Sequence, residues 1–239
     1  MNQLILASTS TLYGQDYLAY LLPELQYFFQ NADVIVFIPY ARPSGISEVD
    51  YTQKARVAFK QIGKQLVGLN EIQNPIETVG NAQGIFVGGG NTFLLVSKLY
   101  ELNLMEAINK ALDHGVPYLG TSAGANIGGL GIHNTNDMPI TLPPTLNTLG
   151  RIPYNINAHY IEPLEDSVHM GETRETRIRE FQCQHEISVV GLPEGSWLRV
   201  MGPEVWTKGE HPVVIFEPNK PAYRMGPDVL LPYNVQNGS

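Results

Sequence analysis

Short apolar runs alternate with stretches of helical spacing through the first half of the chain. The runs have no polar face and are rich in β-branched residues, which is typical of strands buried on both sides of a parallel sheet. They lie at residues 4–7, 33–38, 85–87 and 116–119, and the helical patterns between them at residues 15–30, 49–66 and 92–112. The alternation predicts βαβ units, and hence an α/β fold with a mainly parallel sheet and helices on both faces. Pro23 is expected to kink the first helix.

The second half of the chain is less regular. Residues 131–165 are rich in Asn, Pro and Thr, and a loop of this length inside a domain usually has a function. A charged surface helix is predicted at 172–184 and a buried strand at 187–192. Short strands after Trp197, such as 213–216, are expected to form antiparallel edge structure. No linker interrupts the pattern, so we expect one domain over 1–239.

Composition and charge exclude several classes of protein. With 43% apolar and 16% charged residues, the chain is not a disordered one. A net charge of −8 argues against a nucleic-acid partner. One cysteine excludes an internal disulfide framework and a cysteine-based zinc site, and it fits a reducing compartment. No basic signal-peptide region and no run of about 18 apolar residues is present, so we expect a cytoplasmic protein without membrane contact.

The segment Gly120-Thr121-Ser122-Ala123-Gly124 matches the nucleophile elbow G-x-S-x-G. A predicted strand precedes it and a helix is expected to follow, which is the required context. The small residues are needed because the serine backbone in such an elbow is strained and crowded. Ser122 is therefore a candidate nucleophile, and an ordinary glycine-rich turn is the alternative.

A nucleophilic serine needs a base and an acid that orients the base. Of the six histidines, His133, His159 and His169 lie in or beside the irregular segment, and His159 is the preferred base because it follows a short strand-like run. Two carboxylates are candidates for the acid. Glu194 follows a buried strand, where functional groups of α/β sheets gather, and Asp137 gives the chain order Ser, Asp, His. Either acid could instead only form a turn.

Two further features indicate a site for an anion. Gly88-Gly89-Gly90 follows a strand and lacks a nucleotide-binding pattern, so its N–H groups, with that of Ala123, are candidates for an oxyanion hole. A tight turn is the alternative. Arg174 falls in the first turn of a predicted helix, where the helix dipole disfavours a cation. A cation beside free N–H groups suits a carboxylate.

Six segments of the chain carry a specific pattern in their order and spacing. They are Gly88-Gly89-Gly90-Asn91-Thr92-Phe93, residues 120–126, Thr135-Asn136-Asp137-Met138-Pro139-Ile140, Asn157-Ala158-His159-Tyr160, Gly171-Glu172-Thr173-Arg174-Glu175 and Gly191-Leu192-Pro193-Glu194-Gly195. Taken together, they closely resemble the peptidase E family of α-aspartyl dipeptidases, and the resemblance runs from the first strand to at least Trp197. The chain departs from the family at Thr121, where Trp is common, and at Ala158, where Pro is common.

The resemblance implies a fold similar to class I glutamine amidotransferases and hydrolysis of dipeptides with an N-terminal aspartate, without a cofactor or a metal. It implies Ser122 as nucleophile and His159 as base, with Asp137 or Glu194 as the acid; we narrowly prefer Asp137. Gly90 and Ala123 would hold the oxyanion, and Arg174 would bind the substrate's carboxylate. The expected partner is a small peptide, and the expected state is a monomer or weak homodimer.

Two alternatives stay open at this point. Another serine hydrolase on the same scaffold, such as a cyanophycinase-like peptidase or an esterase, would keep the elbow but would not need Arg174. A non-catalytic ligand-binding domain would tolerate loss of the nucleophile, yet Ser122 and His159 are both present.

Overall fold

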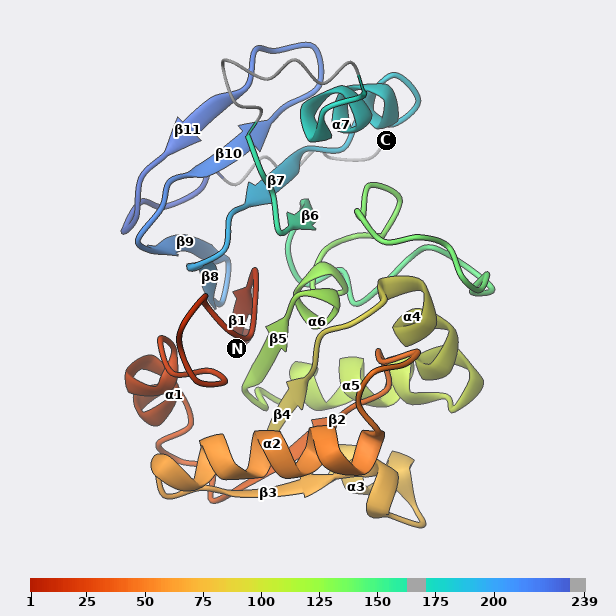
Figure 1. The fold of residues 1–239 in the computed structure, drawn as a ribbon, viewed down its shortest axis with the longest axis vertical. Coiled ribbons are helices and arrows are strands. Elements are labelled where there is room, and N and C mark those ends of the chain that lie inside the picture. The colour runs from red at the N-terminus through yellow and green to blue at the C-terminus, as the bar shows by residue number, and fades with distance from the viewer. Residues whose placement is uncertain (163–170, 233–239) are drawn as a thin grey trace.

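The computed structural model describes residues 1–162 and 171–232, and its larger sheet forms the middle of the molecule (Figure 1). In this part of the chain the larger sheet has seven strands in the order β3-β2-β4-β5-β1-β8-β9. The first five are parallel, and β8 and β9 add an antiparallel edge. The strands are β1 (Gln3–Ala7), β2 (Val34–Ile38), β3 (Gln65–Gly68), β4 (Gly84–Val87), β5 (Tyr118–Thr121), β8 (Ser196–Met201) and β9 (Glu204–Gly209). The predicted α/β class with a mainly parallel sheet is confirmed.

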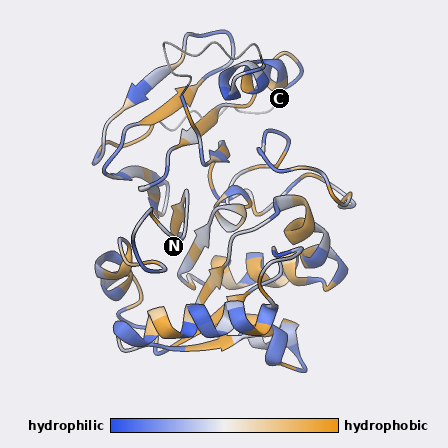
Figure 2. Cartoon of the chain, in the orientation of Figure 1, coloured by the Kyte–Doolittle hydropathy of each residue, from blue (hydrophilic) through white to orange (hydrophobic). Residues whose placement is uncertain are grey.

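Both faces of this sheet are covered, which explains why its strands are apolar throughout. Successive residues of one strand enter different cores, so that Ile85 packs with one set of helices and Phe86 with the other. The helices α3, α4 and α5 cover the first face, and α1 and α2 cover the second. In Figure 2 the strands β2 and β4 in the middle of the sheet are accordingly orange, while the helices carry both colours.

The helices follow the predicted order, with two differences in length. Their bounds are α1 (Leu22–Phe28), α2 (Glu48–Gln61), the 3-10 turn η1 (Leu69–Glu71), α3 (Pro75–Gly80), α4 (Thr92–Glu101), α5 (Leu104–Asp113), α6 (Ala123–Asn126) and α7 (Arg174–Gln182). The helix expected at 15–30 is wrong in extent: α1 begins at Leu22, and Pro23 occupies its first turn instead of kinking it. The helix expected at 49–66 is also too long. It ends at Gln61 because Gly63 takes a left-handed φ of 72°, and β3 follows.

A second sheet lies above the first in Figure 1, together with α7. Its order is β11-β10-β7-β6, with β6 and β7 parallel and the other pairs antiparallel. The strands are β6 (Asn155–Ala158), β7 (Val189–Leu192), β10 (Val213–Phe216) and β11 (Tyr223–Met225). One face shares the core of the larger sheet, and the other packs on α7 through Ile178. The sequence predicted antiparallel C-terminal strands but not that they form a separate sheet.

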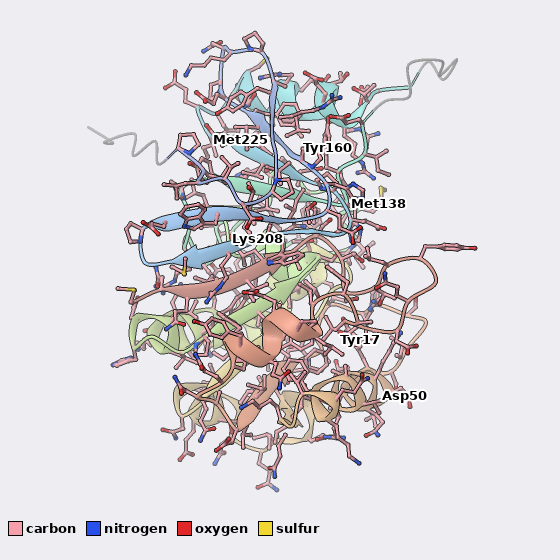
Figure 3. The ribbon with its side chains drawn as sticks, turned by 90° about the vertical axis from the view of Figure 1, so that its left-hand side faces the viewer. Tyr17, Asp50, Met138, Tyr160, Lys208 and Met225 are labelled. Atoms are coloured by element: carbon pink, nitrogen blue, oxygen red, sulfur yellow. The ribbon has the colours of Figure 1, made fainter. Side chains whose placement is uncertain are left out.

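The side view separates the two sheets clearly. Tyr160 and Met225 lie with the second sheet in the upper part of Figure 3, whereas Tyr17 and Asp50 lie in the lower part, beside the larger sheet. Within the described ranges, no helix has both the length and the apolarity needed to cross a membrane.

The parallel strands bring their carboxyl ends to one edge, so the residues that follow β1, β4 and β5 lie near one another and face the ends of β6 and β7.

Candidate active site

Ser122 occupies a strained turn between β5 and α6. Its backbone angles, φ 54° and ψ −111°, lie outside the regions that residues other than glycine usually adopt. The flanking glycines leave no room for a side chain: a Cβ on Gly120 would lie 2.1 Å from the Gly124 carbonyl oxygen, and one on Gly124 would lie 2.2 Å from that of Val87. The elbow predicted from the G-x-S-x-G pattern therefore has the geometry that the pattern requires.

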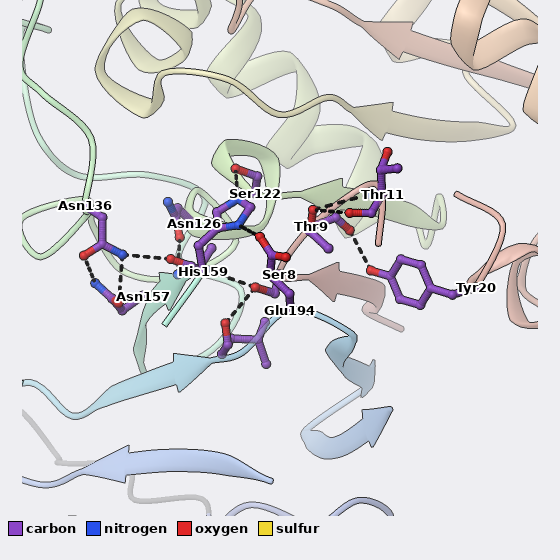
Figure 4. A network of polar contacts seen from close by, with 12 residues as sticks. Ser8, Thr9, Thr11, Tyr20, Ser122, Asn126, Asn136, Asn157, His159 and Glu194 are labelled. Atoms are coloured by element: carbon purple, nitrogen blue, oxygen red, sulfur yellow. Dashed lines mark hydrogen bonds and ion pairs between the residues drawn. The ribbon is translucent and has the colours of Figure 1, made fainter. Parts of the chain in front are cut away.

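His159 follows β6 and contacts both Ser122 and Glu194. Its Nε2 lies 2.9 Å from Ser122 Oγ, and its Nδ1 lies 2.7 Å from Glu194 Oε1. Figure 4 shows the imidazole between the hydroxyl and the carboxylate. Both distances are those of hydrogen bonds, so the three side chains form a continuous chain from nucleophile to base to acid. Glu194 is 54% exposed and His159 37% exposed, so the acid is partly solvated.

Ser8 ties the backbones of the base and the acid together. Its hydroxyl accepts a hydrogen bond from the His159 N–H at 2.9 Å and donates one to the Leu192 carbonyl at 2.7 Å. The side chain is fully buried at the carboxyl end of β1. This holds His159 in its left-handed conformation (φ 54°) beside the loop that carries Glu194. Sequence reasoning missed Ser8; a serine directly after a buried strand was the available signal.

Tyr20 lies beside Glu194 without adding charge. Its hydroxyl donates to the Thr9 carbonyl at 2.6 Å (Figure 4). Burial raises the pKa of this phenol, and the charge of Glu194 adds to the shift. The tyrosine therefore stays neutral at physiological pH.

Asp137 does not contact His159. Its carboxylate accepts hydrogen bonds from the Thr92 N–H at 2.7 Å and the Thr92 hydroxyl at 2.5 Å, at the start of α4. The preference for Asp137 as the partner of the imidazole is thus corrected: the structure gives that contact to Glu194. The physical reason is that Asp137 follows no strand of either sheet, whereas Glu194 leaves β7 next to β6 and its histidine.

A polar network links Asp137 to the histidine strand. Asn126 donates to the Thr92 hydroxyl at 3.0 Å and accepts from the Ala158 N–H at 3.2 Å. Asn136 donates to the Ala158 carbonyl at 2.8 Å and pairs with Asn157. These asparagines bond the irregular segment to β6, and this network holds Asp137 near the triad without a hydrogen bond to His159.

The amides proposed for an oxyanion hole lie on either side of Ser122. Gly90 follows β4 with a φ of 149°, and a Cβ there would lie 2.1 Å from the Ala41 carbonyl oxygen. Its neighbour Gly89 is so close to the nucleophile that a Cβ would lie 2.9 Å from Ser122 Cβ. Among the described residues, neither the Gly90 N–H nor the Ala123 N–H has an acceptor. Both are thus available to a ligand oxygen.

Arg174 begins α7 and is partly buried, yet it forms no hydrogen bond or ion pair with the described residues. The neighbouring glutamates are taken by other arginines: Glu172 pairs with Arg177 and Glu175 with Arg179. Burial lowers the pKa of the Arg174 guanidinium, and Arg177 adds to this, while the charge of Asp137 acts in the opposite sense. A surface salt bridge therefore does not account for this arginine.

Three of the other histidines, His114, His133 and His185, make their contacts outside the triad. His114 bonds the Lys110 carbonyl at the end of α5 through its Nδ1, 2.7 Å away, as expected for a structural residue. His133 and His185 pack on Phe181 of α7, and burial lowers the pKa of His133. His169 falls outside the described residues.

Thr121, which precedes the nucleophile, is fully buried, and its hydroxyl has no hydrogen-bond partner in the described part of the chain. A buried unpaired hydroxyl destabilises a fold by about 1–3 kcal/mol. We expect Thr121→Val to raise the free energy of unfolding by about 1 kcal/mol and Tm by about 2–4 °C. Thermal and urea unfolding of the purified variant measure this.

Thr207→Val is the matched control for that prediction. Thr207 is equally buried, but its hydroxyl donates to the Gly226 carbonyl at 2.6 Å and accepts from the Val229 N–H at 3.0 Å. This variant should lose stability. Equal shifts for both valine variants would show that the Thr121 hydroxyl is paired after all.

Comparison with known proteins places this site in a family. The model of Peptidase family S51 matches residues 4–207. Peptidase E of Streptomyces coelicolor is 42% identical over 214 residues, covering 89% of this chain and 86% of the relative. A Drosophila melanogaster protein named "Probable alpha-aspartyl dipeptidase" is 38% identical over 239 residues and 98% of both chains. The crystal structure of a peptidase from an acI-B1 Actinobacterium, 16% identical, shares the fold with a TM-score of 0.72 over 97% of this chain and 96% of its own. The expected segments are present in order, and the family model matches most of the chain. This chain therefore belongs to peptidase family S51.

Proposed function

We propose that this chain is a serine dipeptidase that hydrolyses dipeptides with an N-terminal aspartate. The observation that carries the proposal is the continuous hydrogen-bonded chain from Ser122 through His159 to Glu194. The names of the relatives, peptidase E and a probable α-aspartyl dipeptidase, support the substrate class. The match covers 98% of this chain and 98% of the Drosophila relative.

The reaction follows from the positions of these groups. Ser122 Oγ attacks the peptide carbonyl while His159 Nε2 takes its proton, and Glu194 holds the Nδ1–H and stabilises the imidazolium. The N–H groups of Gly90 and Ala123 bind the oxyanion of the tetrahedral intermediate. His159 then protonates the leaving amine, and a water activated by the same imidazole hydrolyses the acyl-enzyme. The products are aspartate and a free amino acid.

Arg174 and Asp137 suit the two charges of an N-terminal aspartate. The substrate carries an α-ammonium and a β-carboxylate only a few bonds apart. Arg174 and Asp137 are close enough for their charges to interact, and Arg174 has no ion-pair partner among the described residues. We assign the β-carboxylate to Arg174 and the α-ammonium to Asp137, because each desolvated charge then meets an opposite one.

The role of Arg174 predicts a large effect on specificity. Arg174→Ala should reduce kcat/KM for Asp-Leu by about 30- to 1000-fold, the range for truncating one partner of a buried charge pair. Arg174→Lys should recover only part of this, because a point charge cannot replace the planar guanidinium. Steady-state kinetics with Asp-Leu and Asn-Leu measure the preference, and Tm should change little.

Arg177→Ala is the control for that experiment. Arg177 lies on the same helix, and its side chain is 61% exposed and paired with Glu172. Its loss should change kcat/KM by less than about fivefold, since an exposed ion pair contributes at most about 1 kcal/mol. If Arg174→Ala keeps the full preference for Asp-Leu over Asn-Leu, Arg174 does not read the substrate side chain.

A panel of Xaa-Leu dipeptides tests the proposed function as a whole. A strong preference for Asp-Leu supports it, together with labelling of Ser122 by a fluorophosphonate probe. Labelling without dipeptide hydrolysis would favour the alternative of another serine hydrolase, such as a cyanophycinase-like peptidase or an esterase. Absence of labelling would favour a ligand-binding domain.

We place the enzyme in the cytoplasm, acting on small peptides as a monomer or weak homodimer. A net charge of −8 supports a partner other than nucleic acid, and a single cysteine, exposed at position 183, fits a reducing compartment.

A further inference from the structure

The glycine run after β4 is anchored on both sides of Gly90. The Gly88 N–H donates to the Ile38 carbonyl at 3.1 Å, and the Asn91 N–H donates to the Ala41 carbonyl at 2.7 Å. Gly90 lies between these anchors, and its N–H has no acceptor among the residues that the structure describes. The run thus isolates one free amide beside Ser122.

Gly89, which directly precedes Gly90, is anchored by a side chain rather than by a backbone carbonyl. The Gly89 N–H donates to the hydroxyl oxygen of Tyr51 at 2.8 Å, and both groups are buried. That hydroxyl is pressed against the run, since a Cβ on Gly88 would lie 2.7 Å from it. Tyr51 therefore bonds the amide that directly precedes the proposed oxyanion donor.

Tyr51 is itself held rigidly. It comes from the first turns of α2 and is only 1% exposed. Phe37 and Tyr17 contact its ring edge-to-face, with centroids 5.1 and 6.1 Å away. The guanidinium of Arg42 lies over the ring, 5.1 Å from its centroid. A rotation of the phenol away from Gly89 would break these contacts, so the acceptor has one position.

We propose that the Tyr51 hydroxyl is a positioning group for the oxyanion hole, an inference that rests on the proposed function. The Gly89–Gly90 peptide carries the free N–H, and its orientation depends on the bonds at Gly89 and Asn91. By accepting the Gly89 N–H, Tyr51 fixes the peptide that precedes this one, and Ala41, by accepting the Asn91 N–H, fixes the peptide that follows it. The Gly90 N–H then points at the place where the oxyanion forms.

Tyr51→Phe would keep the ring and remove only the acceptor. The surroundings of the hydroxyl are mainly apolar, so the Gly89 N–H would be left unpaired. The run would turn to find another acceptor, and the Gly90 N–H would turn with it. An oxyanion donor acts in the transition state and contributes little to binding of the substrate, so the loss should appear in kcat and not in KM.

The test compares Tyr51→Phe with the matched control Tyr17→Phe. Tyr17 is a buried tyrosine of the same cluster; its hydroxyl donates a long hydrogen bond (3.4 Å) to that of Tyr51 and forms none with the glycine run. For Tyr51→Phe we expect kcat for Asp-Leu to fall about 10- to 100-fold, with KM within about twofold of the unchanged enzyme. Tyr17→Phe should keep kcat within about threefold.

A second readout separates transition-state from ground-state binding. An aldehyde analogue of aspartate forms a hemiacetal with Ser122 Oγ, and its alkoxide would occupy the oxyanion hole. Its affinity should weaken in Tyr51→Phe by the same factor as kcat, whereas the affinity for free aspartate should not change. Equal losses for both ligands, or a kcat equal to that of Tyr17→Phe, would overturn the proposal.

Hydrogen exchange in the unaltered enzyme tests the inference even if Tyr51→Phe fails to fold. With ¹⁵N-glycine labelling, the Gly89 amide should be protected in the free enzyme, and the Gly90 amide should become protected only in the aldehyde adduct. A Gly89 amide that exchanges as freely as Gly90 would overturn it. An unaltered enzyme that does not cleave Asp-Leu would instead contradict the proposed function.

Discussion

Ser122→Ala and His159→Ala should each reduce kcat for Asp-Leu by at least about 10⁴-fold. Without the hydroxyl no acyl-enzyme can form, and without the imidazole the serine keeps its proton. The 2.9 Å contact between Ser122 Oγ and His159 Nε2 makes them one proton-transfer unit. The double variant should therefore be little worse than either single variant.

Steady-state kinetics of the three variants at saturating Asp-Leu measure these losses. Circular dichroism and Tm check that the fold persists; alanine keeps the Cβ, so the strained φ of 54° at Ser122 is unaltered and Tm should change little. Losses that multiply in the double variant would contradict the shared role. Normal turnover by Ser122→Ala would exclude Ser122 as the nucleophile.

Glu194→Gln should lower kcat by about 10²- to 10³-fold with little change in KM. The amide can donate to His159 Nδ1, which fixes the tautomer that carries its proton toward Ser122 and so cannot accept the serine proton. The imidazolium also loses its counter-charge. We place the expected loss below the roughly 10⁴-fold effect of buried triad acids, because the Glu194 side chain is 54% exposed and solvent screens its charge.

Two further variants make that result specific. Glu210 is an exposed acid close to Glu194, because its backbone N–H donates to the Gly195 carbonyl. Glu210→Gln removes this charge and should leave kcat unchanged. Asp137→Asn should mainly raise KM, because Asp137 bonds Thr92 and not the imidazole. A large fall in kcat for Asp137→Asn with normal kcat for Glu194→Gln would reverse the assignment of the two acids.

Local sequence patterns predicted most of the fold. The continuous apolar runs located β1, β2, β4, β5 and β7 to within a few residues, because strands buried on both faces have no polar side to disguise them. The strand β3 was missed, since Gln65–Gly68 is short and follows a helix whose pattern runs into it. The separate second sheet was missed as well, because strand pairing between β6, β7 and β10 joins segments far apart in the chain.

In the candidate site, too, local features were predicted from the sequence and contacts between distant segments were not. The nucleophile elbow is a local structure, so Gly120 to Gly124 already defined it, and the order of the motifs indicated the family. Which acid meets His159 depends on β6 lying beside β7, and no local pattern contains that pairing. The same is true of Ser8, which joins His159 to Leu192, and of Tyr51, which reaches Gly89 from 38 positions away in the chain. The sequence by itself determined the chemistry of the groups, whereas only the tertiary structure decided their partners, because hydrogen bonds act over about 3 Å in space whatever the separation along the chain.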